Sequence, residues 1–169
     1  MKLEEIEAGQ SVFIDANIFI YHFTGMSVEC KEFLKACTVK KFNAFTSLTV
    51  LAEVCHRLMA IEAVKLGLTQ SKQPASYLQR NPAAVRKLSE YYEQMTNILG
   101  WGIGIVNAGE NFIIKSQIYR HRFGLLTNDS LIPAHMEEAG TSNLASADKI
   151  FNAIGHITLY SPSDIDHLN

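Results

Sequence analysis

One apolar stretch near the start of the chain, residues 12–21 with the sequence VFIDANIFIY, constrains the fold more than any other segment. It has the composition of a buried strand, yet it contains the carboxylate of Asp15 and, two residues later, the amide of Asn17. An ionised carboxylate in an apolar strand costs several kcal/mol unless it is paired, metal-bound or at the open end of the strand. In an α/β sequence, such a residue indicates a site at the carboxyl edge of a parallel sheet.

Short apolar segments alternate with amphipathic segments along the 169 residues. This alternation is typical of a parallel sheet that is covered by helices on both faces. We therefore predict an α/β fold with three layers, α/β/α, around a central, mainly parallel sheet of four or five strands. The predicted strands are 12–21, 43–47, 101–106, 143–145 and 157–160. The predicted helices are 28–37, 83–99, 109–123, 130–139 and 147–153. A further helix is predicted to begin after a capping residue at 46, 47 or 49 and to end at about 66.

The chain, residues 1–169, is predicted to form a single domain with its core at 11–160. Segment 69–82 is polar and holds two prolines, which predicts a connection with one helical turn in it. Segment 83–99 is predicted to be an amphipathic helix. Together they make 69–99 an extended helical insertion or hairpin, suited to a dimer surface or a substrate clamp. The apolar stripe of the helix is Val85, Leu88, Tyr92, Met95 and Leu99.

Composition narrows the class of protein. Apolar residues make up 47% and charged residues 19% of the chain, as in soluble globular proteins. No apolar run is long enough to predict a membrane span, and the N-terminus does not resemble a targeting segment. Cys30, Cys37 and Cys55 fit no metal or disulfide pattern and are expected to be buried thiols in a reducing cytoplasm. The net charge of −2 argues against a strongly basic nucleic-acid binder, but it allows an enzyme that touches a few phosphates.

Three further carboxylates are expected at the end of a strand or at the start of the helix after it. Glu53 lies at the edge of the apolar stripe of its helix, where it can point along the sheet edge or pair with Arg57 one turn later. Asp129 and Asp148 each precede a helix, and each taken alone is well explained as an N-cap. Because the carboxyl ends of parallel strands share one edge, we expect Asp15 and these three acids to converge there.

Converging carboxylates have a definite chemical requirement. Like charges raise one another's pKa values, so the group stays ionised only with cations nearby. Hard divalent ions with oxygen ligands, Mg²⁺ or Mn²⁺, are the natural partners. Such an ion lowers the pKa of a bound water and stabilises charge that builds on a phosphate. The four acids together therefore favour a metal-dependent hydrolase of phosphodiesters.

The chain resembles the PIN domain family (named for the PilT N-terminus), and within it the VapC-like toxins of toxin–antitoxin pairs. The resemblance is carried by VFIDANIFIY, TSLTVLAEVCHRL, LLTNDSLIPAHMEEAG and NLASADKIF, in the family's order. It implies metal ligands or metal-positioning groups at Asp15, Glu53, Asp129 and Asp148, with Asn17 and Ser146 in support. It further implies an Mg²⁺- or Mn²⁺-dependent endoribonuclease that cleaves single-stranded or structured RNA, usually as a homodimer, with a protein antitoxin as a partner.

Other functions stay open at this point. A PIN domain that acts in RNA processing without an antitoxin would carry the same acids, and a non-catalytic RNA- or protein-binding module usually lacks one or more. A flap-type DNA nuclease would be expected to carry more acids and a longer helical arch. The basic run 120–122 either holds RNA phosphate or is a solvated helix end. The histidines show no zinc spacing, and no GxSxG or complete GxGxxG motif occurs.

Overall fold

Five parallel strands form the central sheet of the computed structural model, which describes residues 1–107, 109 and 111–165. Their order across the sheet is β3-β2-β1-β4-β5, and Phe13 in β1 pairs with Phe45 on one side and Leu144 on the other. The predicted α/β class and mainly parallel sheet are confirmed. The strands are β1 (Ser11–Ile14), β2 (Asn43–Ser47), β3 (Gly104–Val106), β4 (Asn143–Ala145) and β5 (Thr158–Tyr160).

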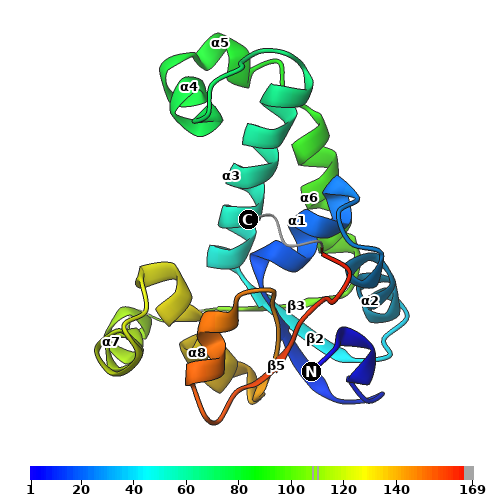
Figure 1. The fold of residues 1–169 in the computed structure, drawn as a ribbon, viewed down its shortest axis with the longest axis vertical. Coiled ribbons are helices and arrows are strands. Elements are labelled where there is room, and N and C mark those ends of the chain that lie inside the picture. Colours follow the sequence, from blue (N-terminus) through cyan, green and yellow to red (C-terminus); the bar gives the residue numbers. More distant parts are fainter. Residues whose placement is uncertain (108, 110, 166–169) are drawn as a thin grey trace.

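Helices cover both faces of this sheet, which gives the expected three layers. In Figure 1, α7 (Phe112–Phe123) and α8 (Thr127–Ala139) lie on one side of the strands and α2 (Val28–Thr38) lies on the other. Helix α1 (Ala16–Thr24) contacts α2 and α3 (Leu48–Lys65). Two short 3₁₀ helices, η1 (Leu3–Glu5) and η2 (Lys149–Ala153), complete the body. No helix in the described part of the chain is long and apolar enough to cross a membrane.

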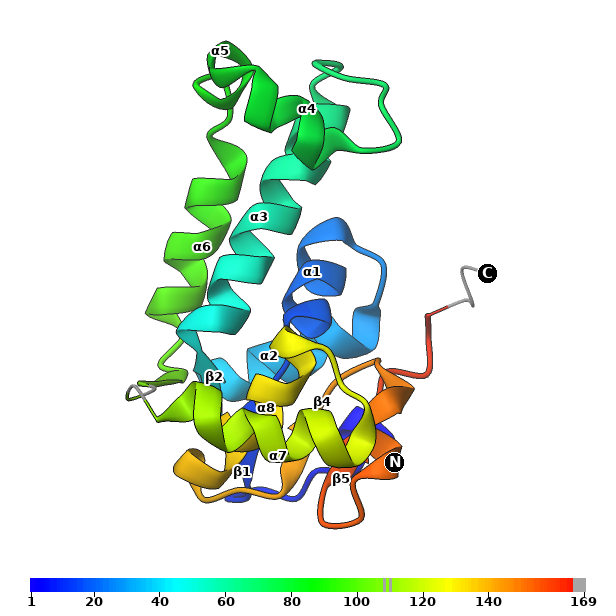
Figure 2. The same cartoon turned by 90° about the vertical axis from the view of Figure 1, so that its left-hand side faces the viewer.

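A pair of helices projects from the body. Helix α3 runs beside α6 (Glu90–Gly100), and the short helices α4 (Pro74–Arg80) and α5 (Pro82–Val85) lie at the far end of the pair (Figure 2). We call α3 to α6 the helical arm and residues 66–89 its tip. The tip has a small apolar cluster of its own, separate from the main core. The cluster contains Ala63, Leu78, Ala84 and Leu88.

The predicted single helix at 83–99 is wrong, because the chain turns within it. Helix α5 ends at Val85 and α6 begins only at Glu90. The carboxylate of Glu62 in α3 accepts hydrogen bonds from the backbone N–H groups of residues 89, 90 and 91, at 2.7, 3.0 and 2.9 Å, and so supplies the N-terminal cap of α6. Because α6 begins at Glu90, its buried face differs from the apolar stripe predicted for 83–99. Tyr92 and Leu99 are 64% and 59% exposed, against the prediction.

The predicted strand at 12–21 is also corrected, since only its first part is strand. Strand β1 ends at Ile14, and α1 begins at Ala16. Asp15 stands between them with an extended backbone, and its carboxylate accepts a hydrogen bond from the N–H of Ala16 at 2.7 Å. The strand at 101–106 shortens to β3, and 147–153 holds the 3₁₀ helix η2 rather than an α-helix. Residue 110 of the predicted helix 109–123 lies outside the described residues.

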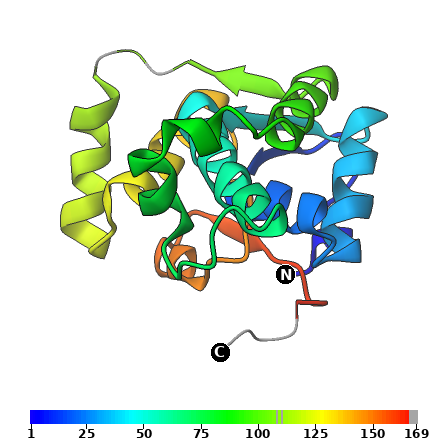
Figure 3. The same ribbon diagram turned by 90° about the horizontal axis from the view of Figure 1, so that it is seen from above.

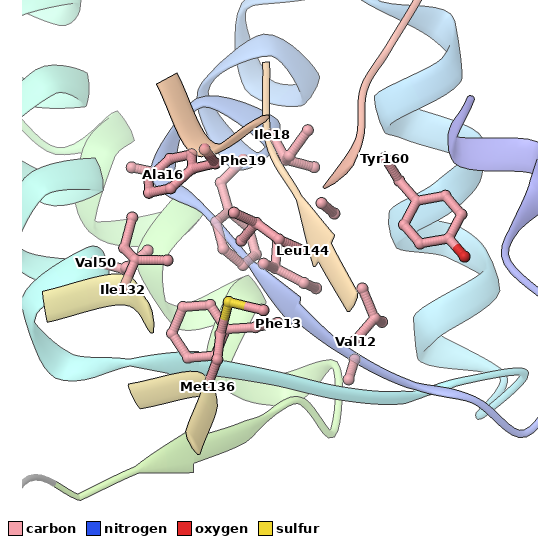
Figure 4. Packing of buried hydrophobic residues seen from close by; sticks show 14 of the residues in the cluster. Val12, Phe13, Ala16, Ile18, Phe19, Val50, Ile132, Met136, Leu144 and Tyr160 are labelled. Atoms are coloured by element: carbon pink, nitrogen blue, oxygen red, sulfur yellow. The ribbon is translucent and has the colours of Figure 1, made fainter. Parts of the chain in front are cut away.

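The main core lies between the sheet and its helices (Figure 4). Phe13 and Leu144 from the strands pack with Phe19 of α1 and Met136 of α8, and all four are buried. Burial of large apolar side chains contributes about 1.5–3 kcal/mol each. Cys30 and Cys37 are buried free thiols, as expected, whereas Cys55 is a free thiol that is only partly buried, against the prediction. This core fixes the end of β1, and with it the position of Asp15.

Candidate metal centre

Four carboxylates from four separate segments line one cavity at the carboxyl edge of the sheet. The cavity has a volume of about 370 Å³ and a largely polar wall. Asp15 follows β1, Glu53 lies in the helix after β2, Asp129 lies in the first turn of α8, and Asp148 follows β4. The structure thus brings together all four acids that the sequence analysis selected.

Asp15 is the most buried of the four acids, and Asn17 and Ser146 hold it in place. Its Oδ2 accepts hydrogen bonds from Asn17 Nδ2 and Ser146 Oγ, both at 2.6 Å. The same amide nitrogen of Asn17 also donates to Ser146 Oγ at 3.1 Å, and its Oδ1 accepts from the N–H of Ala147 at 3.0 Å. These bonds join the ends of β1 and β4, so the carboxylate has one fixed orientation toward the cavity.

The electrostatic environment disfavours the charged forms of two of these acids. Burial raises the pKa of Asp15 to about 6; hydrogen bonds from Ser146 and Ala16 oppose the rise, while the charges of Glu53 and Asp129 add to it. The pKa of Asp129 is also raised, by burial first and then by the charges of Asp148 and Glu53. Among the described residues, no Lys, Arg or His forms an ion pair within 4 Å with any of the four.

Arg57 and Tyr21 also line the cavity, and neither was selected from the sequence for this role. The sequence predicts Arg57 as an ion-pair partner of Glu53, and that pair is not formed among the described residues. The sequence places Tyr21 at the end of the predicted strand 12–21. Its position four residues after Asn17, on one face of α1, would have been the signal had the helix been recognised.

Asp129 and Asp148 differ in how they enter the cavity. Asp148 caps η2, accepting a hydrogen bond from the N–H of Ile150 at 3.0 Å, as an N-cap reading expects. Asp129 does not cap α8, because that helix begins two residues earlier, at Thr127. The predicted N-cap role of Asp129 is therefore wrong, and its carboxylate has no capping role.

The donor set fits a hard divalent cation in chemistry. All four side chains offer carboxylate oxygens, the ligands that Mg²⁺ and Mn²⁺ prefer. Within residues 1–107, 109 and 111–165, no three His, Cys, Asp or Glu side chains are grouped closely enough to enclose an ion by themselves. Mg²⁺ commonly binds through one or two carboxylates and keeps several waters, so a cavity of this size and polarity suits a hydrated ion.

The PIN domain family model matches residues 12–157. The chain belongs to the PIN domain family. No curated protein matches its sequence. Its fold is similar to a chain in the crystal structure of VapBC2 from Rickettsia felis bound to a DNA fragment from their promoter, at 16% identity and a TM-score of 0.58, covering 90% of this chain and 99% of that one.

A second solved structure, a toxin-antitoxin complex from Klebsiella pneumoniae, is similar at 21% identity and a TM-score of 0.55. That match covers 87% of this chain and 95% of the other. At these identities the two structures establish a common fold. The PIN domain match runs from β1 to the segment before β5, and it therefore includes every acid of the cavity.

Proposed function

We propose that this PIN domain is a metal-dependent endoribonuclease of the VapC-like toxin type, using Mg²⁺ or Mn²⁺. The single observation that carries the proposal is the cavity in which Asp15, Glu53, Asp129 and Asp148 meet without a cationic partner within ion-pair distance among the described residues. A non-catalytic module has no need to hold four acids together against their repulsion.

Each residue of the cavity has a role in this proposal. Asp15, Glu53, Asp129 and Asp148 would hold the ion, directly or through its bound waters, and the ion would supply an activated water and stabilise charge on the phosphate. Asn17 and Ser146 keep Asp15 oriented, as outer-shell partners do in metal sites. Arg57, a cation on the cavity wall, would contact a phosphate oxygen of the RNA with its guanidinium.

The partners follow from the same proposal. The substrate is RNA. The similar structure from Klebsiella pneumoniae is a toxin-antitoxin complex and the one from Rickettsia felis is VapBC2, which supports a protein antitoxin for this chain as well. A homodimer, acting in the cytoplasm, completes the proposal. Helix α7 offers a surface for such an assembly, because Ile113, Ile114 and Ile118 are exposed on it. In Figure 3, α7 lies at the margin of the molecule.

Cleavage of RNA by purified protein, with and without Mn²⁺, tests the activity. Wild-type protein is expected to cleave only with the metal, and Asp15→Asn is expected to be inactive. Asp164→Asn is a matched control. Asp164 also accepts hydrogen bonds from a serine hydroxyl and two backbone N–H groups, but it lies outside the cavity. Equal cleavage by wild type and Asp15→Asn would point to a contaminant and overturn the proposal.

The toxin assignment has a separate test. Induced expression of the wild-type chain is expected to arrest growth, and co-expression of a small protein encoded beside it is expected to relieve the arrest. Growth unaffected by a protein that cleaves RNA in vitro would favour a PIN domain of RNA processing instead.

A further inference from the structure

The charges of this chain are unevenly distributed along the sequence. Residues 63–89 contain five cationic side chains and no Asp or Glu, whereas the rest of the chain has ten cationic and seventeen acidic residues. The protein as a whole therefore has a net charge of −2, while this segment is strongly basic. The five cations are Lys65, Lys72, Arg80, Arg86 and Lys87.

Four of these cations are exposed at the tip of the helical arm. Lys72, Arg80, Arg86 and Lys87 are all exposed, and none of them forms an ion pair within 4 Å among the described residues. Arg80 donates from Nε to the carbonyl oxygen of Ser76 at 3.1 Å, which leaves the terminal nitrogens of its guanidinium for another partner. The fifth, Lys65, is paired with Glu90 at 2.7 Å.

The arm is built to hold its tip in a fixed place. Glu62 caps α6 from α3 with three backbone hydrogen bonds, and Lys65 pairs with Glu90 one turn away. Apolar contacts among Leu78, Ala84 and Leu88 support the tip from inside. In Figure 1, α4 and α5 lie on the same side of α3 as α7 and α8. Arg80 is the last residue of α4, Arg86 and Lys87 lie in the turn that follows α5, and Lys72 lies in the loop before α4.

The acid cavity lies at the other end of the same helix. Glu53 and Arg57 line the cavity from the first half of α3, and Lys65 is the last residue of that helix. At 1.5 Å per residue, the distance along the axis from Glu53 to the tip is about 18 Å. At about 3.4 Å per stacked nucleotide, this corresponds to about five nucleotides of RNA.

We propose that the tip of the helical arm is an RNA-binding surface that holds backbone phosphates about five nucleotides from the cleavage site. This inference rests on the proposed ribonuclease activity and specifies its substrate, an RNA long enough to span cavity and tip. The physical reason is electrostatic. At the sheet edge one arginine, Arg57, stands against four carboxylates, so a basic region elsewhere adds attraction for RNA. Phosphate contacts position a nucleic acid without reading its sequence.

Two variants of the full chain with the same loss of charge test the proposal. The tip variant replaces Lys72, Arg80, Arg86 and Lys87 by Gln, and the control variant replaces the exposed Lys31, Lys35, Lys40 and Lys41 by Gln. Binding of a fluorescein-labelled RNA hairpin with a single-stranded tail is measured by anisotropy in EDTA, over a range of salt. The tip variant is expected to bind about tenfold or more weakly and with a shallower salt dependence, and the control within about twofold of wild type.

Cleavage kinetics with Mn²⁺ add a second readout. The tip variant is expected to raise KM for the hairpin about tenfold with kcat unchanged, and to cleave a trinucleotide as wild type does, because the trinucleotide cannot reach the tip. Equal weakening in both variants would show a general charge effect and overturn the proposal. Unchanged RNA binding in the tip variant would also overturn it, and would leave the tip as a surface for an acidic protein.

Failure of the ribonuclease proposal is separable from failure of this one. If wild type cleaves no RNA with Mn²⁺ but the tip variant alone loses RNA binding in EDTA, the tip assignment stands without the catalytic one. Circular dichroism and thermal unfolding of both variants check the fold, which these exposed substitutions are expected to leave intact.

Discussion

Two buried carboxylates, Asp15 at the sheet edge and Glu62 in the helical arm, have almost the same exposure, 7% and 5%. Each accepts three hydrogen bonds. Their pKa values nevertheless move in opposite directions. Burial raises the pKa of Asp15 to about 6, with Glu53 and Asp129 adding to the rise. Burial also acts to raise the pKa of Glu62, but three backbone N–H groups and Lys65 outweigh it, and the net shift is downward.

The two residues differ in how far the protein stabilises the charge of a buried carboxylate. Glu62 stands at a helix N-terminus, where oriented N–H groups and the helix dipole stabilise its charge, so it is fully satisfied by the protein. Asp15 has good hydrogen bonds but acidic neighbours, so its charge is left short of positive partners. An acid of the first kind stabilises the fold, and one of the second kind is ready for a cation.

The largest expected effect concerns catalysis at the sheet edge. Asp15→Asn is expected to lower kcat/KM for RNA cleavage about 100-fold or more, because a lost metal ligand removes several kcal/mol of transition-state stabilisation. Glu62→Gln, on the same RNA with Mn²⁺, is expected to stay within about twofold of wild type, since this residue contacts no part of the cavity. A comparable loss in both variants would erase the distinction between the two acids.

The pH dependence of stability should have opposite signs for the two acids. The folded pKa of Asp15 lies above its unfolded value, so its favourable contribution is complete below about pH 3.8 and is lost as the pH rises through about 6. The folded pKa of Glu62 is lowered, so its contribution is present above about pH 4.5 and is lost as the pH falls through its folded pKa.

Denaturant unfolding in EDTA from pH 3 to pH 8 measures both contributions (about 1.4 kcal/mol per pKa unit). The unfolding free energy of wild type minus that of Asp15→Asn is expected to fall as the pH rises from about 4 to about 6, by on the order of 2–3 kcal/mol. The corresponding difference for Glu62→Gln is expected to rise with pH at the acid end. Slopes of the same sign would contradict the comparison.

Stability at neutral pH separates the two residues further. Glu62→Gln is expected to lower the free energy of unfolding by about 1–3 kcal/mol. In the wild type, the carboxylate of Glu62 accepts hydrogen bonds from three backbone N–H groups, and in the variant the amide nitrogen of Gln would face some of these donors without accepting from them. Urea unfolding at pH 7 measures the change. Asp15→Asn in EDTA serves as the reference. Its amide also meets hydrogen-bond donors, but the substitution removes the repulsion from Glu53 and Asp129, so a smaller loss of stability is expected.

A smaller effect is expected from the partners of Asp15. Ser146→Ala removes the hydroxyl that donates to Asp15 Oδ2 and should lower kcat/KM about tenfold, within the range seen for outer-shell partners of metal ligands. Ser161→Ala is the control, because this hydroxyl donates to the carbonyl oxygen of Ser146 and does not contact the acid. Equal activity of Ser146→Ala and wild type would remove the positioning role of Ser146.

The residues that the sequence places correctly are those at the ends of strands. Asp15 and Asp148 follow β1 and β4, and parallel strands bring such ends to one edge. Asp129 follows no strand and reaches the cavity from the first turn of α8. The sequence also predicted the parallel sheet. It did not reveal Glu62, although this acid continues the i,i+4 series Val50, Val54 and Leu58 of the buried stripe.

The errors have one physical cause, which is long-range contact. The break between α5 and α6 is fixed by a carboxylate from a different helix, and no local pattern in 83–99 contains it. The basic tip is not evident as a dense cluster such as 120–122, because its cations are spread over residues 72–87 and its signal is the absence of acids from 63–89. In the structure, the basic run 120–122 lies in the last turn of α7, where Arg120 donates hydrogen bonds to Gln117 and to the carbonyl oxygen of Ile113 in the same helix.

Thermal unfolding with Mn²⁺ tests most directly the claim that the sheet-edge acids form a cation site. At a metal concentration of about 100 times Kd, binding to the folded state adds about 2.7 kcal/mol. Wild type and Glu62→Gln are expected to rise in Tm by the same amount when Mn²⁺ replaces EDTA, and Asp15→Asn is expected to rise much less. An equal rise in Asp15→Asn, or no rise in wild type, would contradict the account.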